Sequence, residues 1–331
     1  MIHSRSFSAG LALALGLSLA VAGAAAPAAA QTDTGDQELQ NLLEDVGIEY
    51  AQGYLAPLIQ TLGVNQNSGL YTTASVPRGK LTFSFGLKVM GSRLADADSA
   101  FSRVLDVTLD ETYGVNPGDP GYGEQGVVEM TGPTVFGNDS RMGTIRAYYL
   151  GALVAEQEGI EGLIDTRWSP LVMPEVAVGG IAGMRVTVRW LPEIEAGDAG
   201  KIKLWGWGLQ YGLTSAMPKL PVDVMVGFFK QNLDIGNVIE TDATSWFLAA
   251  SKSFSVLTLY GGAAKESSNF KAHYTWNRSD GTEVPVALEV EGAQKSRFTL
   301  GASLAIGVRL NADVNIGSEL TTYSAGLGFG F

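Results

Sequence analysis

The chain has 331 residues with 42 glycines, 12 prolines and no cysteine, and its formal net charge is −12. This acidic balance argues against a nucleic-acid partner, because phosphate binding needs clustered Lys and Arg, and the lack of cysteine excludes a fold held by disulfides. Beyond the first 30 residues no run approaches the roughly 18 apolar residues of a transmembrane helix, so an apolar content of 46% requires another explanation.

Residues 1–30 have the organisation of a secretory signal peptide. Arg5 precedes a short apolar run, and Ala28 and Ala30 supply small side chains just before Gln31. The apolar run is shorter than the roughly 20 residues that a membrane-spanning helix needs. We therefore expect export and cleavage between Ala30 and Gln31, with a retained N-terminal anchor as the alternative.

Residues 31–79 are predicted to form a helical segment. From residue 34 to residue 62 the apolar residues recur at the three-and-four spacing of one helical face, at Leu39, Leu42, Leu43, Val46, Tyr50, Tyr54, Leu55, Leu58 and Ile59. Pro57 is expected to kink this helix. Its apolar face needs a partner, so we expect the segment to plug a barrel or to dock at its periplasmic rim. Its polar face carries Glu38, Glu44, Asp45 and Glu49, which could pair with the inward Arg185, Arg189 and Arg309.

From Lys80 onward the apolar period changes to two. Leu81, Phe83 and Phe85 alternate with small or polar residues, and the same alternation recurs at residues 184–190, 270–276 and 298–309. The last run exceeds the usual globular strand of about 5–6 residues but suits a tilted membrane strand of about 9–11 residues. These runs predict β-strands with one apolar and one polar face.

Residues 80–331 are predicted to form an antiparallel transmembrane β-barrel of 12–14 strands, which makes the fold class all-β. A soluble antiparallel sandwich shows the same alternation, but strand length, small residues on the polar face and aromatic residues near strand ends favour the barrel. Trp190, Trp205, Trp207, Tyr211 and Trp276 are expected at the membrane interfaces. The irregular stretch from residue 111 to about residue 142 is expected to be an extracellular loop or a constriction in the lumen.

The last strand carries the most specific signal. Tyr323, Ala325, Leu327, Phe329 and Phe331 share one face, and glycines occupy the other. This pattern resembles the C-terminal strand of bacterial outer-membrane β-barrel proteins, in which a terminal Phe and the alternating apolar residues are recognised by the barrel-insertion machinery. The resemblance implies an assembly signal at Tyr323, Leu327, Phe329 and Phe331, and a location in the bacterial outer membrane.

The layout of a helical segment before a barrel also resembles the outer-membrane fatty-acid transporter family, whose N-terminal segment plugs the barrel. A closer likeness is to a family of uncharacterised exported barrel proteins and spans most of the mature chain. The segments that carry it are residues 43–55, 67–71, 133–137 and 205–211. It implies the fold and no particular activity.

If the apolar faces meet lipid, several charged residues face the lumen. The candidate lumen and ligand residues are Lys88, Arg185, Arg189, Lys271, His273 and Arg309, and Arg297 also faces inward, with Asp106, Asp110, Asp223, Glu289, Glu291 and Asp313 as acidic counterparts. One interpretation is a basic ladder that guides an anionic solute. The other is a mixed network that pairs across the barrel and with the plug, and the balance of signs favours it.

The leading functional hypothesis is a passive channel or transporter for small apolar or anionic solutes across the outer membrane. A closed barrel with a structural or surface-interaction role is the alternative. A hydrolase is the second alternative, although we do not expect an enzyme, because its chemistry would rest on His273 alone. We expect no cofactor and no metal site, because a zinc site draws on several Cys or His ligands. The expected partners are outer-membrane lipid, the insertion machinery and the solute.

Overall fold

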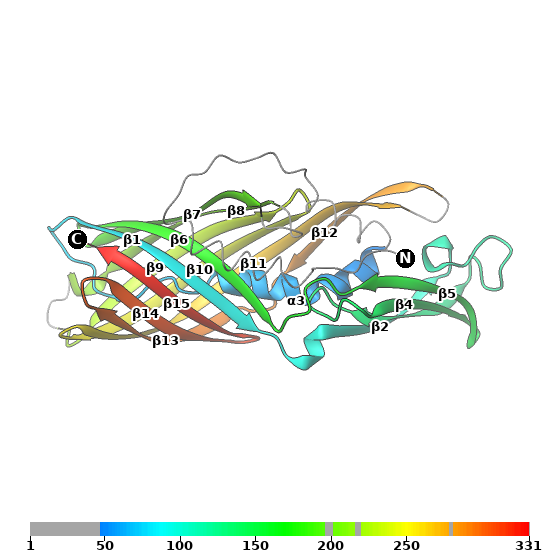
Figure 1. Cartoon of the computed structure of the whole chain (residues 1–331), viewed down its shortest axis with the longest axis horizontal. Helices are drawn as coiled ribbons and strands as arrows, with labels where there is room; N and C mark the ends of the chain where they lie inside the picture. Colours follow the sequence, from blue (N-terminus) through cyan, green and yellow to red (C-terminus); the bar gives the residue numbers. More distant parts are fainter. Residues whose placement is uncertain (1–46, 196–200, 216–219, 278–280, 331) are drawn as a thin grey trace.

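The computed structural model describes residues 47–195, 201–215, 220–277 and 281–330. This part of the chain contains one α-helix, α3 (Ile48–Gln66), short 3-10 helices, and fifteen strands (Figure 1). The strands are β1 (Thr82–Arg93), β2 (Ala100–Thr108), β3 (Gln125–Pro133), β4 (Met142–Tyr149), β5 (Ala152–Glu161), β6 (Trp168–Ile181), β7 (Met184–Glu195), β8 (Lys201–Gly212), β9 (Asp223–Ile235), β10 (Ile239–Phe254), β11 (Leu257–Asn277), β12 (Glu283–Glu291), β13 (Ser296–Ala305), β14 (Arg309–Gly317) and β15 (Thr321–Gly330). The expected signal peptide, its cleavage point at Ala30 and Gln31, and Phe331 lie outside the described residues.

Ten strands form a closed antiparallel ring in the order β1, β6, β7, β8, β9, β10, β11, β13, β14, β15 and back to β1. At the seam, Gly86 of β1 lies opposite Glu175 of β6 on one side and opposite Gly328 of β15 on the other. The predicted all-β antiparallel barrel is therefore confirmed, with ten strands in the ring rather than 12–14. The estimate was too high because residues 94–167 leave the ring, and because β10 and β11 are 16 and 21 residues long.

Residues 94–167 form a separate four-stranded sheet of β2, β3, β4 and β5, which we call the inserted sheet. This sheet projects beyond one end of the barrel, the same end at which β11 and β12 extend past the ring, and the C-terminus lies at the opposite end (Figure 1). The predicted irregular stretch of residues 111–142 contains β3 (Gln125–Pro133) and is thus partly ordered as sheet. Asp106 and Asp110 belong to this region and not to the barrel lumen.

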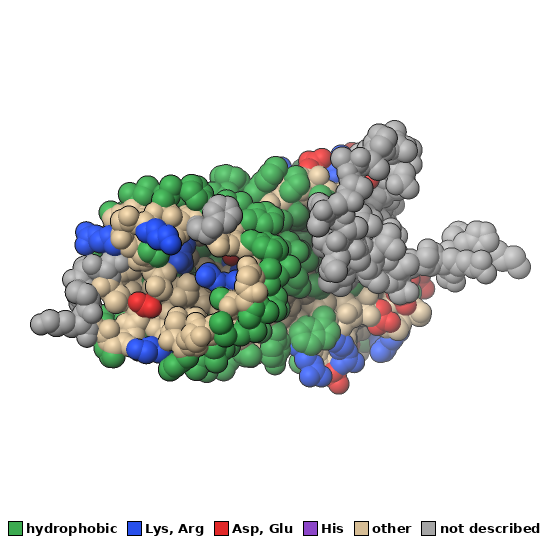
Figure 2. Space-filling view, turned by 60° about the vertical axis from the view of Figure 1, so that its left-hand side comes forward, with side chains coloured by type: hydrophobic (Ala, Val, Ile, Leu, Met, Phe, Trp, Pro, Cys, Tyr) green, Lys and Arg blue, Asp and Glu red, His purple; other side chains and the backbone are tan. Residues whose placement is uncertain are grey.

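The outer surface of the barrel carries a broad apolar band, visible in Figure 2. On β1 the side chains of Phe83, Phe85 and Val89 point outward and are exposed, whereas Lys88 and Met90 point inward and are buried. Five tryptophans also point outward, at positions 168, 190, 205, 207 and 246. Trp276, which we expected at the same interface, instead packs against the buried core beyond the ring, in the part formed by α3, the β2–β5 sheet and the ends of β11 and β12, which we call the extension.

The polarity of the two faces reverses along β11. In its first half the outward residues are apolar, including Leu257 and Leu259, and the inward ones include Tyr260. From Lys265 onward the outward residues are polar, and Phe270, Ala272 and Tyr274 point inward and are buried. The expected lumen positions of Lys271 and His273 are therefore wrong: both lie on the outer face of the extension, because the apolar face of this segment meets α3 and not lipid.

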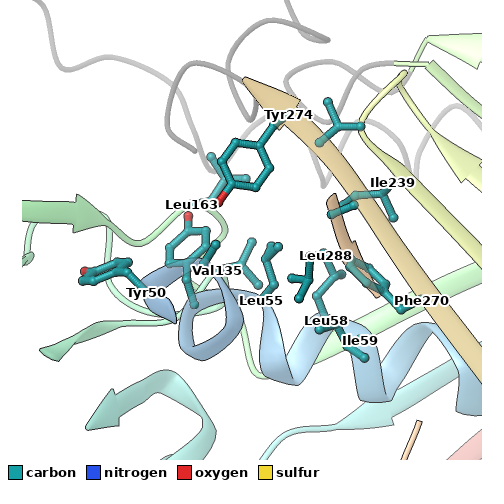
Figure 3. Close-up of a cluster of buried hydrophobic side chains, with 14 of the residues drawn as sticks. Tyr50, Leu55, Leu58, Ile59, Val135, Leu163, Ile239, Phe270, Tyr274 and Leu288 are labelled. Carbon is teal, nitrogen blue, oxygen red and sulfur yellow. The ribbon is translucent and has the colours of Figure 1, made fainter. Parts of the chain in front are cut away.

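The main hydrophobic core lies beyond the ring and surrounds α3. Side chains of the helix, among them Leu55, Leu58 and Ile59, pack between the β2–β5 sheet and the extended strands β11 and β12 (Figure 3). Pro57 lies inside the helix without ending it, and the Thr61 hydroxyl donates to the Pro57 carbonyl at 2.9 Å. The apolar face of the predicted helix is thus buried mainly against two sheets.

Tyr50 joins α3 to the inserted sheet. Its hydroxyl accepts a hydrogen bond from the Ile160 amide at 3.3 Å and donates to the Ile160 carbonyl at 3.4 Å. Three glycines on adjacent strands, Gly132, Gly143 and Gly159, form the floor beneath the phenol, and a Cβ atom at any of them would overlap the hydroxyl oxygen. We call these three residues the glycine socket.

Candidate functional site

Residues 64–76 cross the barrel lumen and are its main content; we call them the lumen segment. The first three of these residues are the last of α3, and the others continue towards the start of β1 at the opposite end of the ring. At the end of the lumen nearest the β2–β5 sheet, the Asn65 amide donates to the Ser169 carbonyl at 2.7 Å, and the Asn65 Oδ1 accepts from the Ser92 hydroxyl at 2.8 Å. Both partners belong to the barrel wall, so the segment is fixed to β1 and β6 from its first residues.

Two arginines of the wall bind the main chain of the lumen segment. Arg189 donates to the carbonyls of Gln66 and Ser68 at 3.3 and 3.1 Å, and also to that of Gly69. Arg297 donates to the Val64 carbonyl at 2.9 Å. These carbonyls lie at or just beyond the C-terminal end of α3, where the helix leaves acceptors unpaired and carries partial negative charge. The wall arginines therefore provide hydrogen-bond donors for carbonyls that the end of the helix leaves unpaired.

Each of these arginines also has a carboxylate partner in the wall. Arg189 is fully buried and lies 3.3 Å from Glu175, and Arg297 lies 3.0 Å from Glu266. Buried charges are stable only when they are paired and their remaining donors are satisfied. Carbonyls of the lumen segment accept hydrogen bonds from the remaining donors of these arginines, which couples the wall and the segment electrostatically.

Neutral polar residues continue these contacts along the segment. Gln231 donates to the Gln66 carbonyl at 2.6 Å, and Gln210 donates to the Leu70 carbonyl at 3.1 Å. Further down, Arg185 donates to the Ser75 carbonyl at 2.7 Å. The wall thus contacts the backbone of the segment over most of its length.

An aromatic group holds the middle of the lumen segment. Tyr71 stacks on Phe247 with ring centroids 4.9 Å apart and meets Tyr260 edge-on at 5.9 Å. The Tyr260 hydroxyl donates to Asp313 at 2.8 Å, and the amide of Asn315 donates to the same carboxylate at 2.6 Å. The aromatic side chains and the polar residues on both sides of them along the segment therefore occupy the centre of the barrel.

A cavity of about 280 Å³ opens at the end of the barrel where the C-terminus lies. Its lining includes Thr72, Lys88, Glu175, Arg309 and Asn311, and we call it the mouth cavity. The inward positions of β15 near it are glycines, which leave the space free of side chains. Figure 2, turned towards this end, shows basic side chains around the mouth.

The structure brings together four of the six predicted lumen residues. Lys88, Arg185 and Arg189 point inward, and Arg309 lines the mouth cavity. The predicted pairing of inward arginines with acidic residues of the helix does not occur at Glu49, which pairs with Arg103 of the inserted sheet at 3.3 Å. The other helix acids, Glu38, Glu44 and Asp45, lie outside the described residues.

Sequence reasoning missed the uncharged and acidic partners of these cations. Glu175, Gln210, Gln231 and Glu266 all contact the arginines or the lumen segment. Strand alternation contains the signal for Glu175, because Val176 and Val178 face outward on β6 and place residue 175 on the other face. The identity of its partner depends on the register between strands, which no single strand reveals.

Burial changes the acidity of tyrosines in the extension. Desolvation raises the pKa of Tyr50 to about 12, although its hydrogen bond to Ile160 opposes the shift. Burial likewise raises the pKa values of Tyr54 and Tyr274. All three phenols are therefore neutral at physiological pH and act as packing groups.

No group of three or more His, Cys, Asp or Glu gathers among the described residues in an arrangement suited to a metal ion. No helix in the same residues has the length and apolar character needed to cross a membrane.

Comparison with known families is decisive for classification. A family model described as a family of unknown function (DUF6588) matches residues 10–331. The chain belongs to this family. The match covers α3, the inserted sheet and all ten ring strands, so the architecture described above is that of a DUF6588 protein. No relative with a curated description matches the sequence.

Solved barrels show distant likenesses to this DUF6588 protein. A loop-deletion mutant of OmpT from Vibrio cholerae has 12% identity and a TM-score of 0.24, covering 76% of this chain and 99% of its own. The toluene transporter TbuX from Ralstonia pickettii has 10% identity and a TM-score of 0.20, covering 79% and 91%. OmpF from Salmonella typhi has 9% identity and a TM-score of 0.22, covering 76% and 98%. With scores this low, they say nothing about what this chain binds.

Proposed function

We propose that the protein is an outer-membrane channel for small solutes whose lumen is closed by its own lumen segment and opens when that segment moves. The apolar outer band and the outward tryptophans support a membrane location, because lipid-facing strands carry apolar residues and aromatic girdles. We further propose that the insertion machinery recognises the outward residues Tyr323, Leu327 and Phe329 together with Phe331.

The main support for this proposal is that hydrogen bonds to backbone carbonyls hold the lumen segment in place. Beyond the end of α3, Arg189 binds the carbonyls of Ser68 and Gly69, Gln210 binds that of Leu70 and Arg185 binds that of Ser75, and each such hydrogen bond contributes about 0.5–3 kcal/mol. Contacts of this size can exchange for water. By contrast, α3 itself is anchored by a large apolar core. We therefore assign the movement to the segment after α3 and not to the helix.

A disulfide lock tests the proposal. The hydroxyls of Thr73 in the lumen segment and Ser251 in β10 lie 3.2 Å apart, close enough for Thr73→Cys with Ser251→Cys to form a disulfide. Because the natural chain has no cysteine, the pair is the only thiol source. In planar bilayers the oxidised double variant should conduct less than wild type, and reduction should restore the wild-type level.

The two single-cysteine variants are the controls, and their conductance should not respond to reductant. A lock that forms fully, as shown by a thiol count, yet leaves conductance unchanged would contradict movement of the lumen segment. The experiment therefore distinguishes a moving plug from a channel that bypasses it.

A second candidate is a closed barrel that presents its inserted sheet as an interaction surface. Residues 94–167 carry 13 acidic and four basic side chains, so most of the net charge of the chain lies on this sheet. An acidic projecting surface suits a basic partner. Absence of conductance in wild type and in the reduced variant alike would favour this candidate over the channel.

We do not propose an enzyme. The imidazole of His273 lies on the exposed face of β11 and forms no hydrogen bond or ion pair with a side chain among the described residues. Histidine-based hydrolysis needs a nucleophile or an acidic partner within hydrogen-bond reach. Equal lipid hydrolysis by wild type and His273→Ala would agree with this, and a loss of activity in the variant would revive the hydrolase hypothesis.

A further inference from the structure

The mouth cavity contains more positive than negative charge. Lys88 lies 4.0 Å from Glu175, and the same carboxylate also accepts from Arg189 at 3.3 Å. One carboxylate is therefore shared by two cations. Arg185, which is bonded to the Ser75 carbonyl and to Gln210, has only neutral partners in these contacts.

Arg309 adds a further cation at the open side of the cavity. Its side chain is exposed and forms no hydrogen bond or ion pair with the other described residues. It lines the same cavity as Lys88, so the two cations repel each other. No carboxylate of the described residues forms an ion pair with Arg309, so the donors of its guanidinium remain available at the cavity that it lines.

The remaining acidic group nearby does not balance these charges. Asp313 is buried two residues from Asn311, but its oxygens already accept hydrogen bonds from Tyr260, Asn315 and Ser324. The cavity lining therefore holds two cations, Lys88 and Arg309, against the single carboxylate of Glu175, which Arg189 also shares. Unbalanced charge in a low-dielectric site is costly, and an anionic ligand would offset it.

We infer that the mouth cavity binds a small, multiply charged oxyanion, held by Arg309 and Lys88 with the amide of Asn311 and the hydroxyl of Thr72 beside them. A guanidinium matches the geometry of phosphate and carboxylate oxygens. The cavity volume of about 280 Å³ admits such an anion together with several waters. Because it names the solute class of the proposed channel, the inference rests on that function for its physiological meaning.

The size of the site argues against larger ligands. Lys88 is held in place by its hydrogen bond to Asn311 at 2.8 Å, and its alkyl chain fills the space above Gly326. The lumen segment closes the inner side of the cavity at Thr72. A bulky or purely apolar molecule would meet charged groups on one wall and the segment behind, so we assign the cavity to compact anions.

The experiment measures binding of inorganic phosphate to the full-length protein in detergent, by calorimetry, with chloride at matched ionic strength as the reference. Arg309→Gln should weaken phosphate binding by about tenfold or more. Lys80→Gln removes the same charge from the exposed rim without lining the cavity, and it should change the affinity by less than about twofold. Heat-modifiable migration on a gel confirms that both variants are folded.

Two results would overturn the inference: phosphate binding no tighter than chloride, or equal losses in the two variants, which would indicate a diffuse rim potential instead of a site. Neither result depends on conductance. Failure of phosphate binding with a working disulfide lock would reject the anion site alone, whereas binding without any conductance would reject the channel alone.

Discussion

The hydroxyl of Tyr50 lies directly against Gly143, and it fits there only because that position of β4 has no side chain. Tyr50 comes from α3, so this contact fixes the inserted sheet to the helix that leads into the barrel. The T-shaped contact between Tyr50 and Phe101, with ring centroids 4.9 Å apart, holds the ring from a second side. The glycine socket is therefore the point at which the sheet is most sensitive to added volume.

Gly143→Ala should destabilise the docking of the sheet by about 1–3 kcal/mol, because overpacking displaces the phenol. Limited proteolysis of the connection at residues 114–124 measures the docking, and cleavage should be faster in the variant. Adding Tyr50→Phe removes the overlapping oxygen and should recover part of the loss. If the effect of Gly143→Ala is the same with Phe as with Tyr at position 50, the overlap is not its cause.

Docking should also weaken at high pH. The pKa of Tyr50 is raised from 10.0 to about 12 because burial favours the neutral phenol. A raised pKa gives stability that is complete below pH 10 and is lost as pH rises from 10 to about 12, with a total of about 2–3 kcal/mol. Denaturant unfolding across this range should show a steeper fall in wild type than in Tyr50→Phe. Parallel curves would show that other tyrosines control the transition.

The reversal of polarity along β11 predicts opposite effects of arginine at two positions on the same face. Leu259→Arg places a charge in the apolar band and should cost about 2–4 kcal/mol of insertion. Ser267→Arg lies eight residues further on the same outward face, in the polar half, and should be tolerated. Folded protein recovered from liposomes measures insertion. Similar yields for both variants would contradict the position of the band.

The two ion pairs Glu266–Arg297 and Glu156–Arg146 should respond differently to loss of their acid. Glu266→Gln leaves the buried Arg297 without its charge partner and should cost about 3–5 kcal/mol. Glu156→Gln breaks an exposed pair and should leave the unfolding midpoint unchanged. Chemical denaturation of both variants measures this contrast. A small effect at Glu266 would mean that the hydrogen bonds of Arg297 to the lumen segment suffice to hold it.

Connection lengths predict the orientation in the membrane. At the end near the C-terminus, turns of two or three residues join β6 to β7, β10 to β11 and β13 to β14, whereas residues 94–167 join β1 to β6 at the other end. Short turns are periplasmic in such barrels, and long connections are extracellular. In this cysteine-free chain, an impermeant maleimide should label Asp119→Cys on intact cells and leave Lys80→Cys unlabelled. The reverse pattern would invert the orientation.

Much of the barrel could be predicted from local periodicity, and the inserted sheet could not. Alternation on β1 and β15 shows which residues face outward, because the two faces of a membrane strand meet different environments. The strands of residues 94–167 alternate in the same way, but their pairing with one another instead of with the ring depends on long-range register. The lumen positions predicted for Lys271 and His273 are wrong for a related reason. Alternation separates the two faces of a strand, but it does not show whether each face meets lipid, water or the protein interior.

The candidate site shows the same limit. The inward positions of Lys88, Arg185 and Arg189 follow from alternation, but their partners do not. Arg189 binds carbonyls of residues 66, 68 and 69, about 120 positions earlier in the chain. Backbone acceptors carry no sequence signature, so pairing with helix carboxylates was the simplest expectation and the wrong one at Glu49.

The closing seam between β1 and β15 has a consequence for the order of assembly. The ring encircles residues 64–76. At one end of the lumen this segment continues into α3 and the bulky β2–β5 sheet, and at the other end it continues into β1, which is itself part of the ring. A ring that had already shut would have to pass one of these through its interior. We therefore expect the nine residue pairs from Ser84↔Gly330 to Ser92↔Thr322, which join the two strands of the ring that are furthest apart in sequence, to form after the N-terminal part is seated. Once formed, that seam keeps the segment inside without any covalent bond.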